Sequence, residues 1–480
     1  MTALFEKAEE LIDKGKAKEA LVLLNELVED DEVKKNKGAQ IAETFGRAFR
    51  IMGDAKRAAA AYLDAAFKDK YLRSQRWHLS SYFFLLHYLQ DIDTAALYGE
   101  LASYEKLFAD VEKFPPRNFS RDKIRIAYLL PYVKKSSLSD FVIPLFTMYN
   151  KNKFEVYIYT FSNEKDEFTK KLELNADVLK ILSEESPKEA AETIYSDEID
   201  ILFDLAGHSE GGITLSLMAY RPAKVQICGI GWPSVLNLSF VDYILTDEIL
   251  TDNLMKDNPL TLPNALCFSP NEKICRMKKT PHNIGSSIKL GVFNNFMKIT
   301  DEMLLLWKEI AESLSGATLI LQDTAAYPAR VEFMKARLKN LEFASKVEVL
   351  TASPDYLKNM VETDIVLDTF PYTGGNMTAT ALTIGTPVIT LKGDRYGSRF
   401  SASILSATDC EEFIAADKKD YKTKVLELAK NEIYLRDLHL NLRKRVEKSR
   451  FFDTERYMEN LENLILQKFA SSLNERRNFK

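Results

Sequence analysis

Residues 364–393 combine a short apolar strand, a glycine-containing loop and the start of a helix, which together can hold a phosphate group. The β-branched run at 365–367 predicts the strand, and TFPYTGG follows it with turn residues and two consecutive glycines. Asn376 is a good N-cap for a helix that we expect to end at Gly385. Free N–H groups and the helix dipole attract phosphate at such a terminus, and glycine allows close approach to the backbone. An ordinary tight turn would also explain these residues, so the loop alone leaves both interpretations open.

The elements around this loop belong to a chain with the composition of a multidomain globular protein. It contains 480 residues, of which 46% are hydrophobic and 28% charged, so we expect two or three domains. The formal net charge of −5 gives no indication of binding to nucleic acid or to an anionic membrane. The first residues lack the apolar stretch of a signal peptide, and no apolar run is long enough to span a bilayer. We therefore expect a cytoplasmic enzyme with no membrane span and no nucleic-acid partner.

Residues 1–118 are predicted to form a helical domain that resembles tetratricopeptide repeats. The stretch 42–69 places small residues where two helices would touch, with a glycine–aspartate turn between them. The stretch 14–27 repeats part of this pattern. Two such units are few for a free-standing solenoid, so we expect this domain to dock on the residues that follow. A plain helical bundle is the alternative.

After Phe114, two prolines break the helical pattern, and strands then alternate with helices. This alternation predicts an α/β fold with two parallel sheets and crossover helices. We place one Rossmann-like domain at 119–275, a second at 276–450 and a C-terminal helix at 451–480. Two doubly wound domains in tandem favour a ligand at the carboxyl ends of their strands.

Four long motifs in the α/β part resemble the protein O-GlcNAc transferases and the plant SPINDLY group. They occur in the family's order, behind helical repeats, at 207–247 (GHSEGG…ILTD), 293–310 (FNNFMKI…WKEI), 367–405 (LDTFPYTGG…SASIL) and 451–469 (FFDTERY…LQKF). The resemblance implies a GT-B fold and a metal-independent, inverting glycosyltransferase that acts on protein side chains. It implies a nucleotide-sugar donor, first of all UDP-GlcNAc, and no cofactor.

The resemblance also assigns donor-binding residues in the second α/β domain. Lys298, in FNNFMKI, matches the lysine that holds the donor diphosphate, where a compact ammonium would stabilise the leaving nucleotide. The preceding Asn294 and Asn295 match an Asn-Gln pair that could bond the diphosphate or the ribose. The donor loop, which holds phosphate through N–H groups and hydroxyls, matches Thr373, Gly374, Gly375, Asn376, Met377 and Thr378.

Three further candidates carry a structural alternative beside the functional one. Tyr356 falls where animal members have a histidine near the base, and it could instead pack on the first turn of a helix. His208, in Gly-His-Ser, matches Gly-His-Thr of SPINDLY-like members and could bond the sugar or the acceptor, or be structural. Asp197 aligns with an aspartate proposed in animal members to receive the acceptor proton through water, and the alternative is a solvated carboxylate.

Several departures from the family pattern leave the donor open. Ser136 and Asp140 stand where the family usually has histidines. Thr380 replaces an acidic residue near the ribose, and Ser353 replaces a lysine near the base. The alternatives are another donor, UDP-glucose or a CMP-nonulosonate, used on flagellin or an adhesin, and a catalytically inactive repeat scaffold. An epimerase of similar architecture is a third.

A metal site is not expected. The four cysteines show no CxxC spacing, and the Asp91–Ile92–Asp93 triplet, which has the spacing of metal-dependent transferases, lies in the helical region. We interpret this triplet as surface charge.

Overall fold

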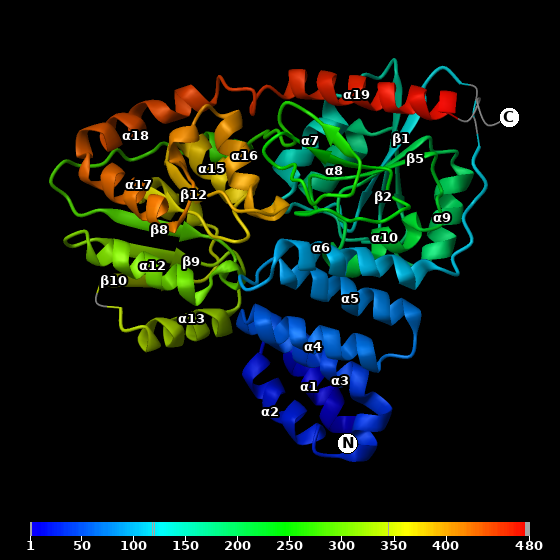
Figure 1. The fold of residues 1–480 in the computed structure, drawn as a ribbon, viewed down its shortest axis with the longest axis horizontal. Helices are drawn as coiled ribbons and strands as arrows, with labels where there is room; N and C mark the ends of the chain where they lie inside the picture. Colours follow the sequence, from blue (N-terminus) through cyan, green and yellow to red (C-terminus); the bar gives the residue numbers. More distant parts are fainter. Residues whose placement is uncertain (1, 118, 120, 344, 476–480) are drawn as a thin grey trace. The chain divides into compact units, whose positions relative to one another are not determined.

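The computed structural model describes residues 2–117, 119, 121–343 and 345–475. The chain divides into two compact units, each made from two separate stretches. Unit 1 contains residues 1–92 and 270–447, and unit 2 contains residues 93–269 and 448–480. Each unit holds one parallel sheet (Figure 1).

The first stretch of unit 1 folds into five helices with clear local signals. Asp30 and Asp54 cap the third and fourth helices through their carboxylates, and Gly53 between them has a φ of 84°. Gly46 is required by packing, because a Cβ there would lie 2.9 Å from the ring of Tyr62. These features confirm the predicted small-residue contact and glycine–aspartate turn. The helices are α1 (Thr2–Asp13), α2 (Ala17–Leu27), α3 (Asp31–Met52), α4 (Ala55–Lys68) and α5 (Leu72–Leu86).

The sheet of unit 1 has the order β10-β9-β8-β11-β12-β13, and all its pairs are parallel. Its strands are β8 (Lys289–Phe293), β9 (Thr318–Gln322), β10 (Lys346–Leu350), β11 (Ile365–Leu367), β12 (Val388–Leu391) and β13 (Ile414–Ala415). Its helices are α11 (Glu272–Cys275), α12 (Asp301–Glu312), α13 (Pro328–Asn340), α14 (Tyr356–Glu362), α15 (Asn376–Ile384), α16 (Phe400–Ala407), α17 (Lys418–Lys430) and α18 (Glu432–Val446). The strand order reverses between β8 and β11, which is where such sheets bind ligands.

The sheet of unit 2 has the order β3-β2-β1-β4-β5-β6-β7 and is also parallel. Its strands are β1 (Ile124–Leu130), β2 (Phe154–Thr160), β3 (Val178–Ile181), β4 (Ile201–Asp204), β5 (Val225–Cys228), β6 (Tyr243–Thr246) and β7 (Pro259–Thr261). Its helices are α6 (Thr94–Ser103), α7 (Ser139–Thr147), α8 (Glu167–Asn175), α9 (Pro187–Ser196), α10 (Ile213–Met218) and α19 (Thr454–Glu475). Here the order reverses between β1 and β4.

Helix α19 returns from the far end of the sequence to complete the core of unit 2. Tyr457, Met458 and Leu461 are buried in the same apolar cluster as the strands of this sheet. Glu462 accepts a hydrogen bond from the Asn150 N–H at 2.7 Å, just before β2. In Figure 1 this helix runs beside α7.

Two parallel Rossmann-like sheets preceded by helices confirm the predicted fold class. The helices predicted at 1–118 are shared between the units, because α1 to α5 belong to unit 1 and α6 belongs to unit 2. Within the ranges described above, no helix is both long and apolar enough to cross a membrane.

Candidate active site

The loop that follows β11 is anchored by a buried carboxylate. Asp368 accepts hydrogen bonds from the N–H groups of Thr369 and Gly374, both at 2.8 Å. It also accepts one from the Thr390 hydroxyl of β12 at 2.7 Å. Burial raises the pKa of Asp368, against these donors, which lower it. This carboxylate therefore fixes the path of the predicted donor loop.

The two glycines of this loop have different roles. A Cβ on Gly374 would lie 2.5 Å from the Thr378 hydroxyl oxygen and 2.9 Å from Asp368 Oδ1. The Thr378 and Ser401 hydroxyls are hydrogen-bonded at 2.8 Å, and Ser401 donates to the Gly374 carbonyl at 2.8 Å. A Cβ on Gly375, by contrast, would meet no atom within 4 Å. Gly374 is thus required by packing, whereas Gly375 leaves open space at the start of α15.

Helix α15 begins one residue earlier than a cap at Asn376 requires, so that prediction was wrong. The N-cap is Gly375, whose φ of −125° and ψ of −83° let the chain turn before the helix starts. Asn376 already has helical geometry, and no side chain caps this terminus. The first N–H groups of α15 therefore lack a capping side chain, which suits them to bind an anion. The helix ends at Gly385, with a φ of 103°, as predicted.

Lys298 contacts this loop directly. It follows β8, and its Nζ donates a hydrogen bond to the Thr373 carbonyl at 3.0 Å. The same ammonium lies 3.9 Å from the ring centroid of Tyr372. Burial lowers the pKa of Lys298 to about 8, while the carboxylate of Asp368 raises it. Because β8 and β11 are neighbours, the structure brings Lys298 and the predicted donor loop together, with a lysine that is mostly protonated at neutral pH.

The two asparagines before Lys298 are not equivalent. Asn294 is buried directly after β8. The side-chain oxygen Oδ1 of Asn295 accepts from the Met297 N–H at 3.0 Å and from Arg330 Nη1 at 2.7 Å. Asn295 therefore holds the turn that carries Lys298.

The remaining unit 1 candidates lie at the edge or in the packed interior. Tyr356 is half-buried at the first position of α14, which follows β10, and β9 separates β10 from β8. It occupies the first turn of a helix and is not brought beside Lys298 by the sheet. The Ser353 hydroxyl accepts from the Asp355 N–H at 3.1 Å, and Thr380 is fully buried in α15.

The N-terminal helices support the loops around Lys298 in unit 1, a role that sequence reasoning missed. Arg330 of α13 donates to the Arg50 carbonyl of α3 at 2.8 Å and 3.2 Å as well as to Asn295. The rings of Tyr88 and Tyr372 are 5.4 Å apart, so the residue under the Lys298 ammonium also contacts Tyr88, which follows α5.

Two further hydrogen bonds join the segment after α5 to the same side of unit 1. Arg395 Nη2 donates to the Leu89 carbonyl at 2.7 Å, and the Thr300 hydroxyl donates to Gln90 Oε1 at 3.0 Å. The docking predicted for the helical region is therefore directed at the loops that surround Lys298.

His208 lies in unit 2, in the loop that follows β4. Its imidazole is buried between the rings of Tyr104 and Trp232, with centroids 4.8 Å and 5.1 Å away. Burial lowers the pKa of His208 to about 3, so the ring is neutral at physiological pH. The preceding Gly207 has a φ of 56°, and a Cβ there would lie 2.4 Å from Trp232. The Asp204 carboxylate accepts from the N–H groups of Ala206 and Gly207 at 2.9 Å and 2.8 Å.

Asp197 lies at the other edge of the same sheet. It follows α9 and precedes β4, and its carbonyl accepts from Arg125 Nη1 near the start of β1 at 2.9 Å. Its carboxylate accepts from the Tyr159 hydroxyl at 2.7 Å and from Lys180 Nζ at 2.6 Å. The structure therefore does not bring Asp197 and His208 together, because one precedes β4 and the other follows it.

The two residues at the family's histidine positions lie after β1. The Ser136 hydroxyl oxygen accepts from the Leu138 N–H at 3.2 Å, and Asp140 is buried in the first turn of α7. Since β1 and β4 are neighbours, both loops emerge at the carboxyl edge of the unit 2 sheet.

A comparison with known protein families shows the family of this chain. The sequence model of glycosyl transferase family 41 matches residues 72–280 and 283–461. The chain belongs to glycosyl transferase family 41. The match covers Lys298, the donor loop and His208, and it begins in α5, which supports the loop around Lys298.

Two plant proteins are similar to this family 41 chain. The probable UDP-N-acetylglucosamine–peptide N-acetylglucosaminyltransferase SPINDLY of Eustoma exaltatum subsp. russellianum is 30% identical over 286 residues, which cover 57% of this chain and 31% of that protein. The SPINDLY protein of Solanum lycopersicum is 25% identical over 382 residues, or 75% of this chain and 40% of that protein. The chain therefore spans less than half the length of these relatives.

A solved structure confirms the fold of this family 41 chain. A mutant of the Thermobaculum terrenum O-GlcNAc transferase superposes with a TM-score of 0.86 at 23% identity, covering 98% of this chain and 91% of that one. The likeness extends over the helices as well as over both sheets.

Proposed function

We propose that this family 41 chain is an inverting glycosyltransferase that moves a sugar from a nucleotide donor onto side chains of a protein. The observation that carries the proposal is the contact between Lys298 and the loop before α15. A protonated ammonium, an uncapped helix terminus and the open space at Gly375 converge there. Positive charge fixed at this place suits a diphosphate.

In the proposed reaction the acceptor side chain attacks C1 of the sugar while the bond from C1 to the diphosphate breaks, and the acceptor releases its proton to water. The departing diphosphate gains negative charge, and Lys298 with the first N–H groups of α15 stabilises it. The proposed mechanism requires no metal ion and no other cofactor. We further propose that the reaction takes place in the cytoplasm.

UDP-GlcNAc is the first donor that we propose. The names of the similar plant and bacterial proteins support it, because they describe transfer of N-acetylglucosamine. Thr380 and Ser353 change the nucleoside side of the site, so UDP-glucose and CMP-nonulosonate remain alternatives, with flagellin or an adhesin as acceptor.

On the unit 2 side, we propose that His208 orients the sugar or the acceptor as a neutral imidazole. Its low pKa makes it a weak base, and its two aromatic neighbours fix the plane of its ring. We do not assign the acceptor proton to Asp197, whose carboxylate is already bound by Lys180 and Tyr159.

The first test compares Lys298, in the turn after β8, with Lys289 at the start of that strand. Lys298→Ala should lower the rate of nucleotide release from UDP-GlcNAc by about a hundredfold or more, which corresponds to about 3 kcal/mol of lost transition-state stabilisation. Lys289→Ala removes an exposed lysine from the start of the same strand and should leave the rate unchanged. Wild-type activity should also fall as the pH rises through about 8, where Lys298 loses its proton. A folded Lys298→Ala protein within threefold of the wild-type rate would contradict the assignment.

The second test distinguishes the donors and the inactive scaffold. Thermal unfolding is measured with UDP, CMP, GDP, ADP and inorganic phosphate at matched concentrations. Binding to the native state at a hundredfold excess over Kd should stabilise by about 2.7 kcal/mol, or a few degrees in Tm. We expect the largest shift with UDP. A shift with CMP alone would favour the nonulosonate donor, and no shift at millimolar nucleotide would favour the scaffold.

A further inference from the structure

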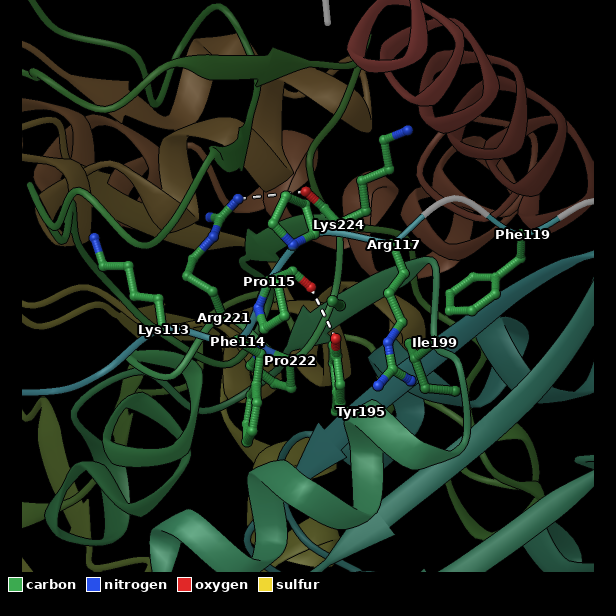
Figure 2. Close-up of a pocket in the computed structure, with 12 residues that line it drawn as sticks. Lys113, Phe114, Pro115, Arg117, Phe119, Tyr195, Ile199, Arg221, Pro222 and Lys224 are labelled. Carbon is green, nitrogen blue, oxygen red and sulfur yellow. Dashed lines mark hydrogen bonds between the residues drawn. The ribbon is translucent and has the colours of Figure 1, made fainter.

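A pocket of unit 2 lies at the edge of the sheet opposite to His208. It has a volume of about 210 Å³ and is lined by residues 113–117, Phe119, the end of α9 and the turn 221–224 (Figure 2). Ile199 in its wall precedes β4, and the turn 221–224 precedes β5, so the pocket is at the edge where these parallel strands begin. The loop of His208 leaves the sheet at the other edge. This pocket is therefore separate from the His208 loop.

Segment 113–117, called the strap below, is fixed against α9. The rings of Phe114 and Tyr195 are stacked 4.6 Å apart at an angle of 15°. The Tyr195 hydroxyl donates to the Pro115 carbonyl at 2.9 Å (Figure 2), and the Phe114 N–H donates to the Tyr220 carbonyl at 2.8 Å. The Arg117 guanidinium lies 3.6 Å from the Tyr195 ring centroid. These contacts preorganise the pocket wall, because two prolines also restrict the strap.

The charged side chains that line the pocket are all positive. Its lining includes four cationic side chains and, within the described part of the chain, no carboxylate; the four are Lys113, Arg117, Arg221 and Lys224. Arg221 is neutralised by Asp242, with Nη1 and Oδ1 2.9 Å apart. Lys224 is largely buried, with its ammonium 5.5 Å from the Phe469 ring of α19.

The two outer cations remain available to a partner. Lys113 and Arg117 are exposed, and among the described residues neither makes an ion pair. Glu198 and Asp200, on either side of Ile199 in the wall, both pair with Arg121. A patch of net positive charge is thus preserved on a chain whose formal net charge is −5.

We propose that this pocket binds an acidic segment of a protein. Arg117 offers a planar fork that matches a carboxylate, and Lys113 offers a second positive charge at the other end of the strap. Between them lies an apolar surface formed by Phe114, Pro115 and Pro222, which suits the aliphatic part of a side chain. Cations spaced along an extended strap fit spaced carboxylates better than one compact phosphate, which would need donors that converge. That the segment belongs to the glycosylation acceptor rests on the proposed function, whereas its binding does not.

The test measures binding without any transfer reaction. The probe is a short fluorescein-labelled peptide of alternating glutamate and alanine, titrated with the full chain and followed by fluorescence anisotropy. The wild type should bind it, and the affinity should fall as salt is added. Lys113→Gln combined with Arg117→Gln should weaken binding about tenfold, since two ion pairs are lost.

A matched control removes the same charge elsewhere on unit 2. Lys151 and Lys153 are exposed, and the Lys151 ammonium lies 5.6 Å from the Tyr149 ring, as Arg117 lies over Tyr195. Lys151→Gln combined with Lys153→Gln should bind the probe like the wild type. An equal loss in this control, or no binding by the wild type at millimolar protein, would overturn the proposal.

Two further measurements separate the outcomes. Displacement of the peptide by an equal concentration of inorganic phosphate would make this a phosphate site and would overturn the peptide assignment. The Tm shift produced by nucleotide should be the same in the Lys113→Gln, Arg117→Gln variant as in the wild type. Failure of the proposed glycosyltransferase function would remove that nucleotide shift without changing the peptide result, so the two failures are distinguishable.

Discussion

The loops after β11 in unit 1 and after β4 in unit 2 have the same anchor but different surroundings. In each, an aspartate at the end of the strand accepts hydrogen bonds from two backbone N–H groups, Asp368 in one and Asp204 in the other. The first loop is then surrounded by hydroxyls and the Lys298 ammonium. The second is packed between aromatic rings that enclose His208. The same strand-end anchor therefore carries a loop beside a charged ammonium in unit 1 and a loop enclosed by aromatic rings in unit 2.

Substitution of a glycine in either loop should have the largest effect on stability. Gly207→Ala places a methyl group 2.4 Å from Trp232 at a positive φ, and Gly374→Ala places one 2.5 Å from the Thr378 hydroxyl. We expect each to lower the free energy of unfolding by about 2–4 kcal/mol, measured by calorimetry. Gly374→Ala should also abolish the Tm shift produced by nucleotide, whereas Gly207→Ala should keep it. Loss of the shift in both variants would mean that the loops do not act separately.

The buried ammonium of Lys298 should lower the free energy of unfolding of the protein at neutral pH. Burial lowers the pKa of Lys298 from 10.5 to about 8, so between these pH values the unfolded chain holds more protons at this residue. Wild-type stability relative to a Lys298→Met variant therefore rises with pH over this interval. At pH 7 the variant should be more stable, by at most about 3 kcal/mol, and the advantage should disappear near pH 10.5.

Urea unfolding of both proteins across this pH range measures the difference. Lys289→Met, at the exposed start of β8, is the control and should show no comparable gain at pH 7. A Lys298→Met variant that is less stable than the wild type at pH 7 would show that the ammonium stabilises its loop, as ordinary packing residues do.

Gly375 should give the smallest effect on stability and a selective effect on binding. Its φ is negative, and a Cβ would contact nothing within 4 Å, so Gly375→Ala should change the free energy of unfolding by less than about 1 kcal/mol. The methyl group would occupy the space in front of the first N–H groups of α15. We expect weaker UDP binding by isothermal calorimetry with little change in Tm. Unchanged affinity would place the diphosphate elsewhere.

The comparison also explains what could be predicted from the sequence. The unit 1 loop can be predicted from the sequence because its strand, glycines and hydroxyl residues are consecutive. Its contact with Lys298 follows once β8 and β11 are known to be neighbours. The ring that packs on His208 from Tyr104 comes from another part of the chain, and no local pattern indicates it. His208 and Asp197 lie at opposite edges of the sheet because β4 runs between them in the sequence, and the bounds of this short strand are needed to see it.

The missed features have the same cause. Contacts such as Arg330 with Arg50, or Tyr88 with Tyr372, join residues about 280 positions apart and leave no periodic signal. Short strands such as β3, β7 and β13 have too few residues for an alternating pattern. The cap lies at Gly375 rather than Asn376, and no side chain makes a capping hydrogen bond there, so the side-chain preference of Asn for the cap position gave the wrong residue.

The return of α19 to unit 2 has a consequence for the order in which the chain is made. The first strand of that sheet begins at residue 124, but Tyr457 and Leu461, which cover part of its core, are added only after residues 270–447 of the other unit. At ordinary rates of translation this interval lasts roughly 10–40 s. During this time the nascent sheet exposes an apolar surface that only a distant helix can cover. A chain that ends before residue 454 would have the Asp368 and Asp204 loops complete, but one core would be left open to aggregation.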